Sequence, residues 1–228
     1  MKKENRQFSE SLLVHFRRVE DLRKEALELT SIDLGFRQLC DLELLLNRGF
    51  YPLEGYLGKE DYDMVLDSMH LSDGTVWPIP VCLDVHEKIA TKLSKGQRVA
   101  LNDGEGFLLA ILTVSDVWQP DKMREAQQVY GTDDPSKHPG VQHLYDQVNP
   151  WYAGGKLEGV SLPIHYDFQH LRLSPSEMVR RFTMNGWRRV LGFHTEDYLH
   201  CAHREMLLSA AREAGAAIFL QPVVGLHH

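Results

Sequence analysis

Three consecutive segments decide the fold of the C-terminal part of this chain: Arg189-Val190-Leu191-Gly192-Phe193, then Cys201 to Ala214, then Ala217 to Val224. The first and third are short apolar runs, which predict strands, and the second predicts a helix. Gly215 follows the last helical position, as is typical of a helix C-terminus. This order predicts a strand–helix–strand unit with parallel strands, which is how an α/β domain begins.

A further helix is expected just before this unit. Ser174-Pro175-Ser176-Glu177 combines the capping-box spacing with proline at the first helical position, so it predicts a helix to about Met184, ended by Asn185-Gly186. A single strand–helix–strand unit cannot complete a doubly wound sheet. We therefore expect a fragment that ends in a truncated Rossmann-like domain, with His227-His228 as the remnant of a tag.

The middle of the chain, over residues 74–116, consists of short β-rich runs separated by turn sequences. Asn102-Asp103-Gly104 lies between the runs 98–101 and 107–117 and predicts a hairpin. Another run covers residues 77–85. Several such turns indicate a small barrel-like β unit.

Helices are expected on both sides of the β unit, over residues 34–47, 61–69 and 121–129. Leucines at three- and four-residue spacing predict the first of them. By contrast, residues 12–18 are expected to be extended. Residues 131–150, with several Asp, Pro and Gly, are expected to form an irregular loop.

Composition narrows the function classes. The 228 residues are 43% hydrophobic and 25% charged, with a mean hydropathy of -0.32, and no apolar run approaches the ~20 residues of a membrane helix. The polar start shows no secretory signal, and three separated cysteines without a CxxC spacing predict reduced thiols in the cytoplasm. A net charge of -7 and a pI of 5.9 give no general attraction to nucleic acid.

The residues with chemical potential cluster between the expected strand and helix of the C-terminal unit, in the stretch 194–203. A helix N-terminus at the carboxyl end of a strand favours phosphate binding. His200 and His203 share one helical face, so both could reach a phosphate oxygen and stabilise negative charge. Two alternatives remain open. One is a helix start with incidental histidines; the other is a zinc site from His194, His200, Cys201 and His203 with Glu196 and Asp197, whose spacing matches no zinc signature.

Ordered motifs run along nearly the whole chain: 40–44 (CDLEL), 49–56 (GFYPLEGY), 73–81 (DGTVWPIPV), 131–134 (GTDD), 138–141 (HPGV), 154–159 (GGKLEG), 165–168 (HYDF) and 221–225 (QPVVG). On these motifs the chain resembles the sulfate adenylyltransferase (ATP sulfurylase) family. The resemblance implies an α+β region, a PUA-like β-barrel domain over residues 1–164, followed by the start of the α/β catalytic domain over residues 165–228.

The resemblance also implies the family reaction, in which sulfate attacks the α-phosphorus of ATP and gives adenylyl sulfate and diphosphate, with magnesium accompanying ATP. ATP, sulfate and adenylyl sulfate are then the expected ligands, and a homo-oligomer is an expected assembly. The implied catalytic residues are His200 and His203, the implied phosphate-binding residues are His194 and Thr195, and no protein metal ligand is implied.

The catalytic signature of the family, Gln-x-Arg-Asn-Pro-x-His-x-x-His, is only partly kept. His200 and His203 match, but His194, Glu196, Asp197 and Tyr198 replace the glutamine, arginine, asparagine and proline. Glu196 stands where the family binds an anion with arginine. Two unit charges at 4 Å interact by ~4 kcal/mol at an effective dielectric of 20, and replacing arginine by glutamate turns this attraction for the anion into repulsion. We expect this chain to be inactive as it stands. The alternative is a non-catalytic scaffold, fused in its parent protein to an adenylyl-sulfate kinase.

Overall fold

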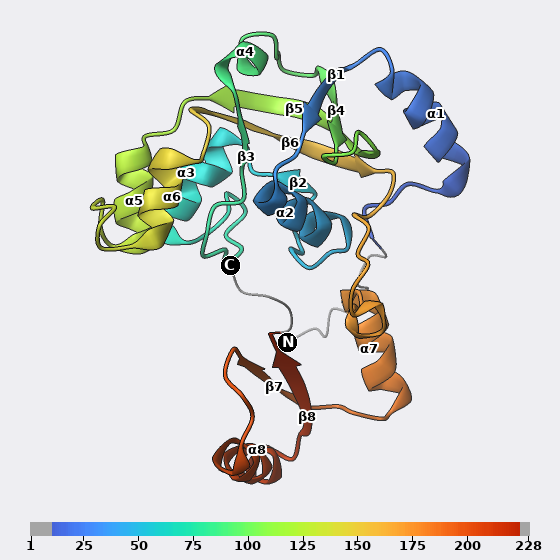
Figure 1. Ribbon diagram of the computed structural model, residues 1–228, viewed down its shortest axis with the longest axis vertical. Coiled ribbons are helices and arrows are strands. Elements are labelled where there is room, and N and C mark those ends of the chain that lie inside the picture. Colours follow the sequence, from blue (N-terminus) through green and yellow to red (C-terminus); the bar gives the residue numbers. More distant parts are fainter. Residues whose placement is uncertain (1–10, 224–228) are drawn as a thin grey trace. The chain divides into compact units, whose positions relative to one another are not determined.

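The computed structural model describes residues 11–223 and divides into two compact units, unit 1 up to Arg172 and unit 2 from Leu173 (Figure 1). His227-His228 and the expected strand end at Val224 lie outside the described residues. Within residues 11–223, no helix combines the length and the apolar character needed to cross a membrane.

Unit 1 is built on a mixed sheet. Its strands are β1 (Thr30–Asp33), β2 (Gly55–Tyr56), β3 (Leu83–Val85), β4 (Arg98–Asn102), β5 (Leu108–Trp118) and β6 (Trp151–Gly159). The strand order is β1-β4-β5-β6-β2, and β3 pairs with the same edge of β6 as β2 does. Only the β1–β4 pair is parallel. The expected hairpin is confirmed, because β4 and β5 pair antiparallel around the turn at Asp103.

The expected barrel is wrong, because the sheet stays open. Closure would require the outer strand β1 to pair with β2 or β3, and the sheet contains no such pairing among the described residues. β2 has two residues and β3 has three, so neither offers a ladder long enough to close a barrel. Of the run expected over residues 77–85, only β3 forms a strand.

Helices cover both faces of the sheet, which explains why β5 is a nearly continuous apolar run. Ile111 packs with Leu22 on one face, and its neighbour Leu112 belongs to the main core with Leu45 and Leu46 on the other. The helices of unit 1 are α1 (Phe16–Ala26), α2 (Phe36–Leu46), α3 (Lys59–Ser68), α4 (Glu87–Ala90), α5 (Lys122–Tyr130) and α6 (Pro139–Asp146), with a 3-10 turn at Gln169–Leu171.

Two expectations for unit 1 need correction. Most of the stretch 12–18 is not extended, because α1 begins at Phe16, and Arg98 binds Glu25 of that helix (Nε–Oε1, 2.5 Å). The segment 131–150 is not all loop, because α6 begins at Pro139, where the imidazole of His138 accepts a hydrogen bond from the N–H of Gly140. In addition, β6 was not predicted, although it pairs with β2, β3 and β5.

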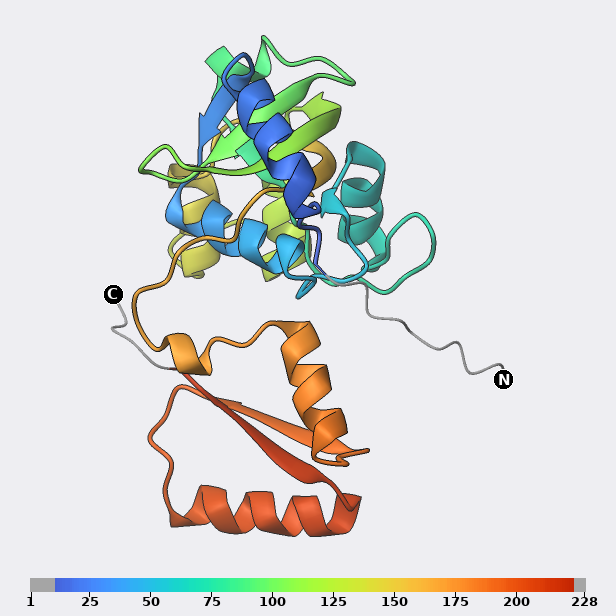
Figure 2. The same ribbon diagram turned by 90° about the vertical axis from the view of Figure 1, so that its right-hand side faces the viewer.

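Unit 2 is the strand–helix–strand unit expected from the sequence, preceded by a helix. Its elements are α7 (Pro175–Met184), β7 (Val190–Thr195), α8 (Cys201–Ala214) and β8 (Ala217–Pro222). The two strands are parallel, and Ser174 and Glu177 form the expected capping box. Figure 2 shows α7 and α8 on opposite faces of the β7–β8 pair. Of the described residues of unit 2, only Leu207 and Ala211 are buried.

Candidate phosphate-binding loop

The candidate site is the loop between β7 and α8, at the carboxyl end of both strands of unit 2. β7 ends at Thr195, whose register partner on β8 is Pro222, and α8 begins at Cys201. The backbone N–H of Asp197 donates to Oγ1 of Thr195 (3.0 Å), which turns the chain away from the strand. This places the N-terminus of a fourteen-residue helix at the edge where α/β sheets bind ligands.

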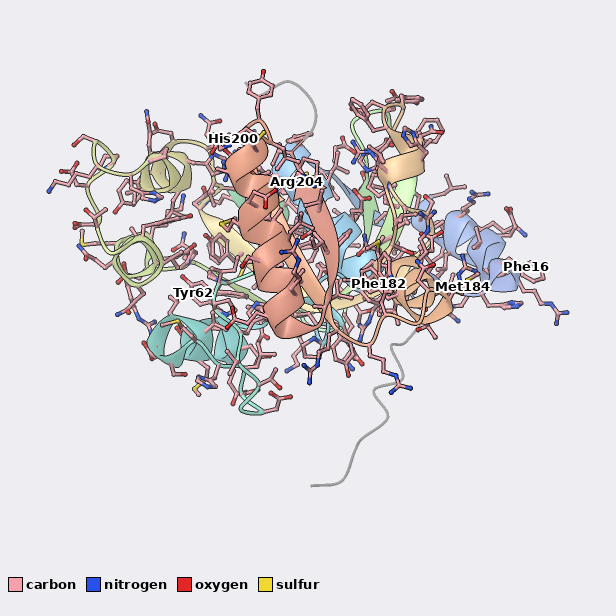
Figure 3. All side chains as sticks on the ribbon, turned by 90° about the horizontal axis from the view of Figure 1, so that it is seen from below. Phe16, Tyr62, Phe182, Met184, His200 and Arg204 are labelled. Carbon is pink, nitrogen blue, oxygen red and sulfur yellow. The ribbon has the colours of Figure 1, made fainter. Side chains whose placement is uncertain are left out.

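His200 is the N-cap of α8. Its Nδ1 accepts a hydrogen bond from the N–H of Ala202 (3.3 Å), so this nitrogen carries no proton in the capped state. The neutral ring therefore has its proton on Nε2, as a hydrogen-bond donor. The side chain is exposed at the start of the helix (Figure 3). The cap fixes the tautomer that can donate to a phosphate oxygen.

His203 stacks on His200, with ring centroids 4.0 Å apart and an interplanar angle of 28°. Its ring centroid also lies 5.8 Å from that of Phe193 of β7. Its Nδ1 is buried and has no hydrogen-bond partner among the described residues. The structure thus brings the two histidines together, as the sequence spacing predicts.

The other residues of the stretch are arranged differently. Phe193 faces α8, and because side chains alternate along a strand, His194 points to the opposite face of the pair. His194 is therefore separated from the two stacked histidines. Glu196 and Asp197 are exposed loop residues, and neither forms an ion pair with another described residue.

Beside His200 lies an apolar pocket of about 430 Å³ within unit 2. Its lining is Leu199, His200, Cys201, Arg204, Leu207, Leu208, Ile218 and Leu220. Arg204, one turn beyond His200 (Figure 3), supplies the guanidinium of this lining and was not singled out from the sequence, although its spacing of four from His200 is visible there. It binds Glu205 (Nη1–Oε1, 2.5 Å).

The zinc alternative finds no support in the structure. Across residues 11–223, no group of three or more His, Cys, Asp or Glu side chains could hold a metal ion. Cys201 is an exposed free thiol at the first position of α8. The stacked histidines therefore lack the further protein ligands that a zinc site needs.

Comparisons with known proteins find two family models and several relatives. A family model described as PUA-like domain matches residues 5–162, and one described as ATP-sulfurylase matches residues 169–228. The sulfate adenylyltransferase of Kluyveromyces lactis is 46% identical over 199 residues, which are 87% of this chain and 39% of that protein. That of Schizosaccharomyces pombe is 44% identical over 210 residues, 91% of this chain and 42% of that protein.

The chain belongs to the sulfate adenylyltransferase family. A solved structure described as the hexameric APS kinase from Thiobacillus denitrificans is also similar, with a TM-score of 0.76 and 33% identity over 95% of this chain and 38% of that chain. The chain spans about two fifths of the length of the curated relatives described above. The PUA-like assignment of the N-terminal part is thereby confirmed, although its sheet is not a barrel.

Proposed function

We propose that this chain carries the phosphate-binding loop of a sulfate adenylyltransferase-type protein, in a form that does not activate sulfate as it stands. The observation that carries the proposal is the pairing of two retained histidines with two exposed carboxylates, Glu196 and Asp197, in one loop. The histidines and the N-terminus of α8 favour a nucleotide phosphate. The two carboxylates disfavour the binding of a nucleotide phosphate.

In the family reaction a sulfate oxygen forms a bond to the α-phosphorus of ATP, and the bond from that phosphorus to the diphosphate oxygen breaks. The proposed role of His200 is to donate its Nε2–H to a phosphate oxygen and so stabilise the developing negative charge. His203 would support the His200 ring through the stacked contact. Glu196 would repel both sulfate and phosphate, because its carboxylate is negative where an anion site requires a positive group.

Magnesium is proposed to enter with ATP. The described residues contain no three-ligand cluster that would form an all-protein cage. Mg²⁺ commonly binds substrate phosphates together with one or two carboxylates and several waters. Bound in this way, it would neutralise phosphate charge.

The second candidate is a non-catalytic scaffold that self-associates and that is fused to an adenylyl-sulfate kinase in its parent protein. Support comes from the apolar surface of unit 2, where Tyr198 is 96% exposed and Met184 79% exposed. The similar structure described as a hexameric APS kinase is consistent with such an assembly.

The histidine assignment is tested by titrating the full chain with inorganic pyrophosphate at low ionic strength, using calorimetry. We expect His203→Gln to weaken binding about tenfold. His200→Ser should do the same, because serine keeps a helix-capping oxygen but removes the imidazole donor. His170→Ala, on the exposed turn Gln169–Leu171, is the control and should bind like the parent chain. Equal binding by all four proteins would contradict the assignment.

A further inference from the structure

Unit 1 contains a polar cavity that the proposed function does not use. A compartment of about 230 Å³ lies between α2, the segment before β3, α5, α6 and β6. A second compartment of about 410 Å³ adjoins it. Both are lined by Arg37, Gln38, Asp84, His143 and Val148, so the two compartments meet along this shared wall.

The lining is rich in carboxylates. Asp41, Asp84 and Glu125 line the smaller compartment, and Asp33 joins Asp84 in the larger one. The opposing groups that line the cavity are His143 and the guanidinium of Arg37, which is exposed at the rim. Lys122 lies nearby, but its Nζ is held by the carbonyl oxygens of Leu144 (2.8 Å) and Val148 (2.5 Å). With all groups ionised and His143 neutral, four carboxylates face two cations.

Two of the three carboxylates that line the smaller compartment keep free acceptor oxygens. Asp84 is fully engaged, because it accepts from Gln38 (2.6 Å) and from both the backbone and the side chain of Asn149 (2.8 Å each). Glu125 uses only Oε2, which accepts from the hydroxyls of Tyr62 (2.9 Å) and Tyr152 (3.0 Å). Its Oε1 and both oxygens of Asp41 have no hydrogen-bond donor among the described residues.

Glu125 gives a second indication that a group is expected here. Its side chain is 7% exposed and lines the smaller compartment, yet its Oε1 has no hydrogen-bond donor among the described residues. A nearly buried carboxylate oxygen without a donor is costly, so an occupant that donates a hydrogen bond to it would stabilise the unit.

We propose that this cavity binds a small aliphatic primary amine, with its ammonium group between Asp41 and Glu125. An ammonium has three donors and a positive charge, which matches the free oxygens of these two carboxylates. Tyr130 and Tyr152 line the same compartment. Ile79, Pro80 and Leu144 provide apolar wall for the alkyl chain. A bare metal ion fits less well, since no three-ligand group is found among the described residues.

The titration behaviour of the cavity is consistent with a missing positive charge. Burial raises the pKa of Asp41 to about 6. The positive charge of Arg37 opposes this shift, and the negative charge of Asp84 adds to it. Burial also raises the pKa of Glu125, although the two tyrosine hydroxyls oppose the shift. The pKa of His143 is lowered by burial and by Arg37. Because Asp41 becomes neutral as the pH falls through about 6, amine binding should weaken below that pH.

The test uses the full chain and n-butylamine as the probe, followed by NMR chemical shifts and calorimetry at constant ionic strength, with n-butanol as the uncharged analogue. We expect 1:1 binding of the amine, no comparable binding of the alcohol, and at least tenfold weaker amine binding in Asp41→Asn. Glu125→Gln should weaken it similarly. Glu60→Gln removes an exposed carboxylate on α3 and should leave the affinity unchanged.

Two results would overturn the proposal. One is the absence of detectable amine binding up to millimolar concentrations of n-butylamine. The other is amine binding that Asp41→Asn leaves unchanged, which would place the amine elsewhere. Glu125→Gln could lower stability because Glu125 holds two tyrosines. Asp41→Asn keeps the test decisive, since Asp41 makes no hydrogen bond that the substitution removes.

Discussion

Replacing Glu196 by arginine and Asp197 by asparagine is expected to raise the affinity of this chain for pyrophosphate at least tenfold. The two substitutions change the loop charge from -2 to +1, beside the exposed histidine cap of α8. Two unit charges at 4 Å interact by ~1 kcal/mol in water, and three units of change give more than the ~1.4 kcal/mol that a tenfold change requires. Calorimetric titration at low salt measures the effect, which added salt should reduce.

A matched control separates local from overall charge. Glu196→Arg and Glu213→Arg change the net charge equally, but Glu213 lies in the last turn of α8, at the other end of the helix. A helix of this length spans about 20 Å, so the distant arginine should have little effect. If both single variants raised the affinity equally, the loop would have no special role.

Gly55→Ala is expected to destabilise unit 1 by about 3 kcal/mol and to lower its melting temperature by roughly 6 to 12 °C. A methyl group at Gly55 would lie 2.0 Å from the carbonyl oxygen of Gly155, where β2 pairs with β6. The neighbouring Gly154 is equally constrained, because its added Cβ would lie 2.1 Å from the carbonyl oxygen of Leu57. Backbone atoms are on both sides, so the strands would have to separate.

The control for this variant is Gly104→Ala, in the turn between β4 and β5. An added Cβ there meets no atom within 4 Å. Differential scanning calorimetry of the three proteins gives the comparison. Melting of Gly55→Ala within 1 °C of Gly104→Ala would show that the close approach of β2 to β6 is not needed for stability.

Local signals explain which elements could be predicted. The capping box at Ser174, the glycine after α8 and the apolar runs of β7 and β8 each determine structure through neighbours in sequence, and all three were confirmed. β6 was missed because Gly154 and Gly155 weaken its strand pattern. Those glycines are required by contacts with β2 and β5, which are remote in sequence.

The same contrast between local signals and remote contacts applies to the two candidate sites. The stacking of His200 on His203 follows from a helical spacing of three, so the sequence predicts it. The cavity in unit 1 could not be predicted, because Asp41, Asp84 and Glu125 come from three separate segments. One signal was present: Asp41 interrupts the leucine-rich helix α2 at a partly buried position.

The central claim is that the loop retains phosphate-binding histidines but does not turn over. The most direct measurement supplies the full chain with adenylyl sulfate, pyrophosphate and magnesium and detects ATP by light emission, with a heat-treated sample as background. The account predicts no ATP above background, even at high protein concentration. ATP formation that His203→Gln abolishes would contradict it, because it would show that a loop carrying Glu196 and Asp197 still supports adenylyl transfer.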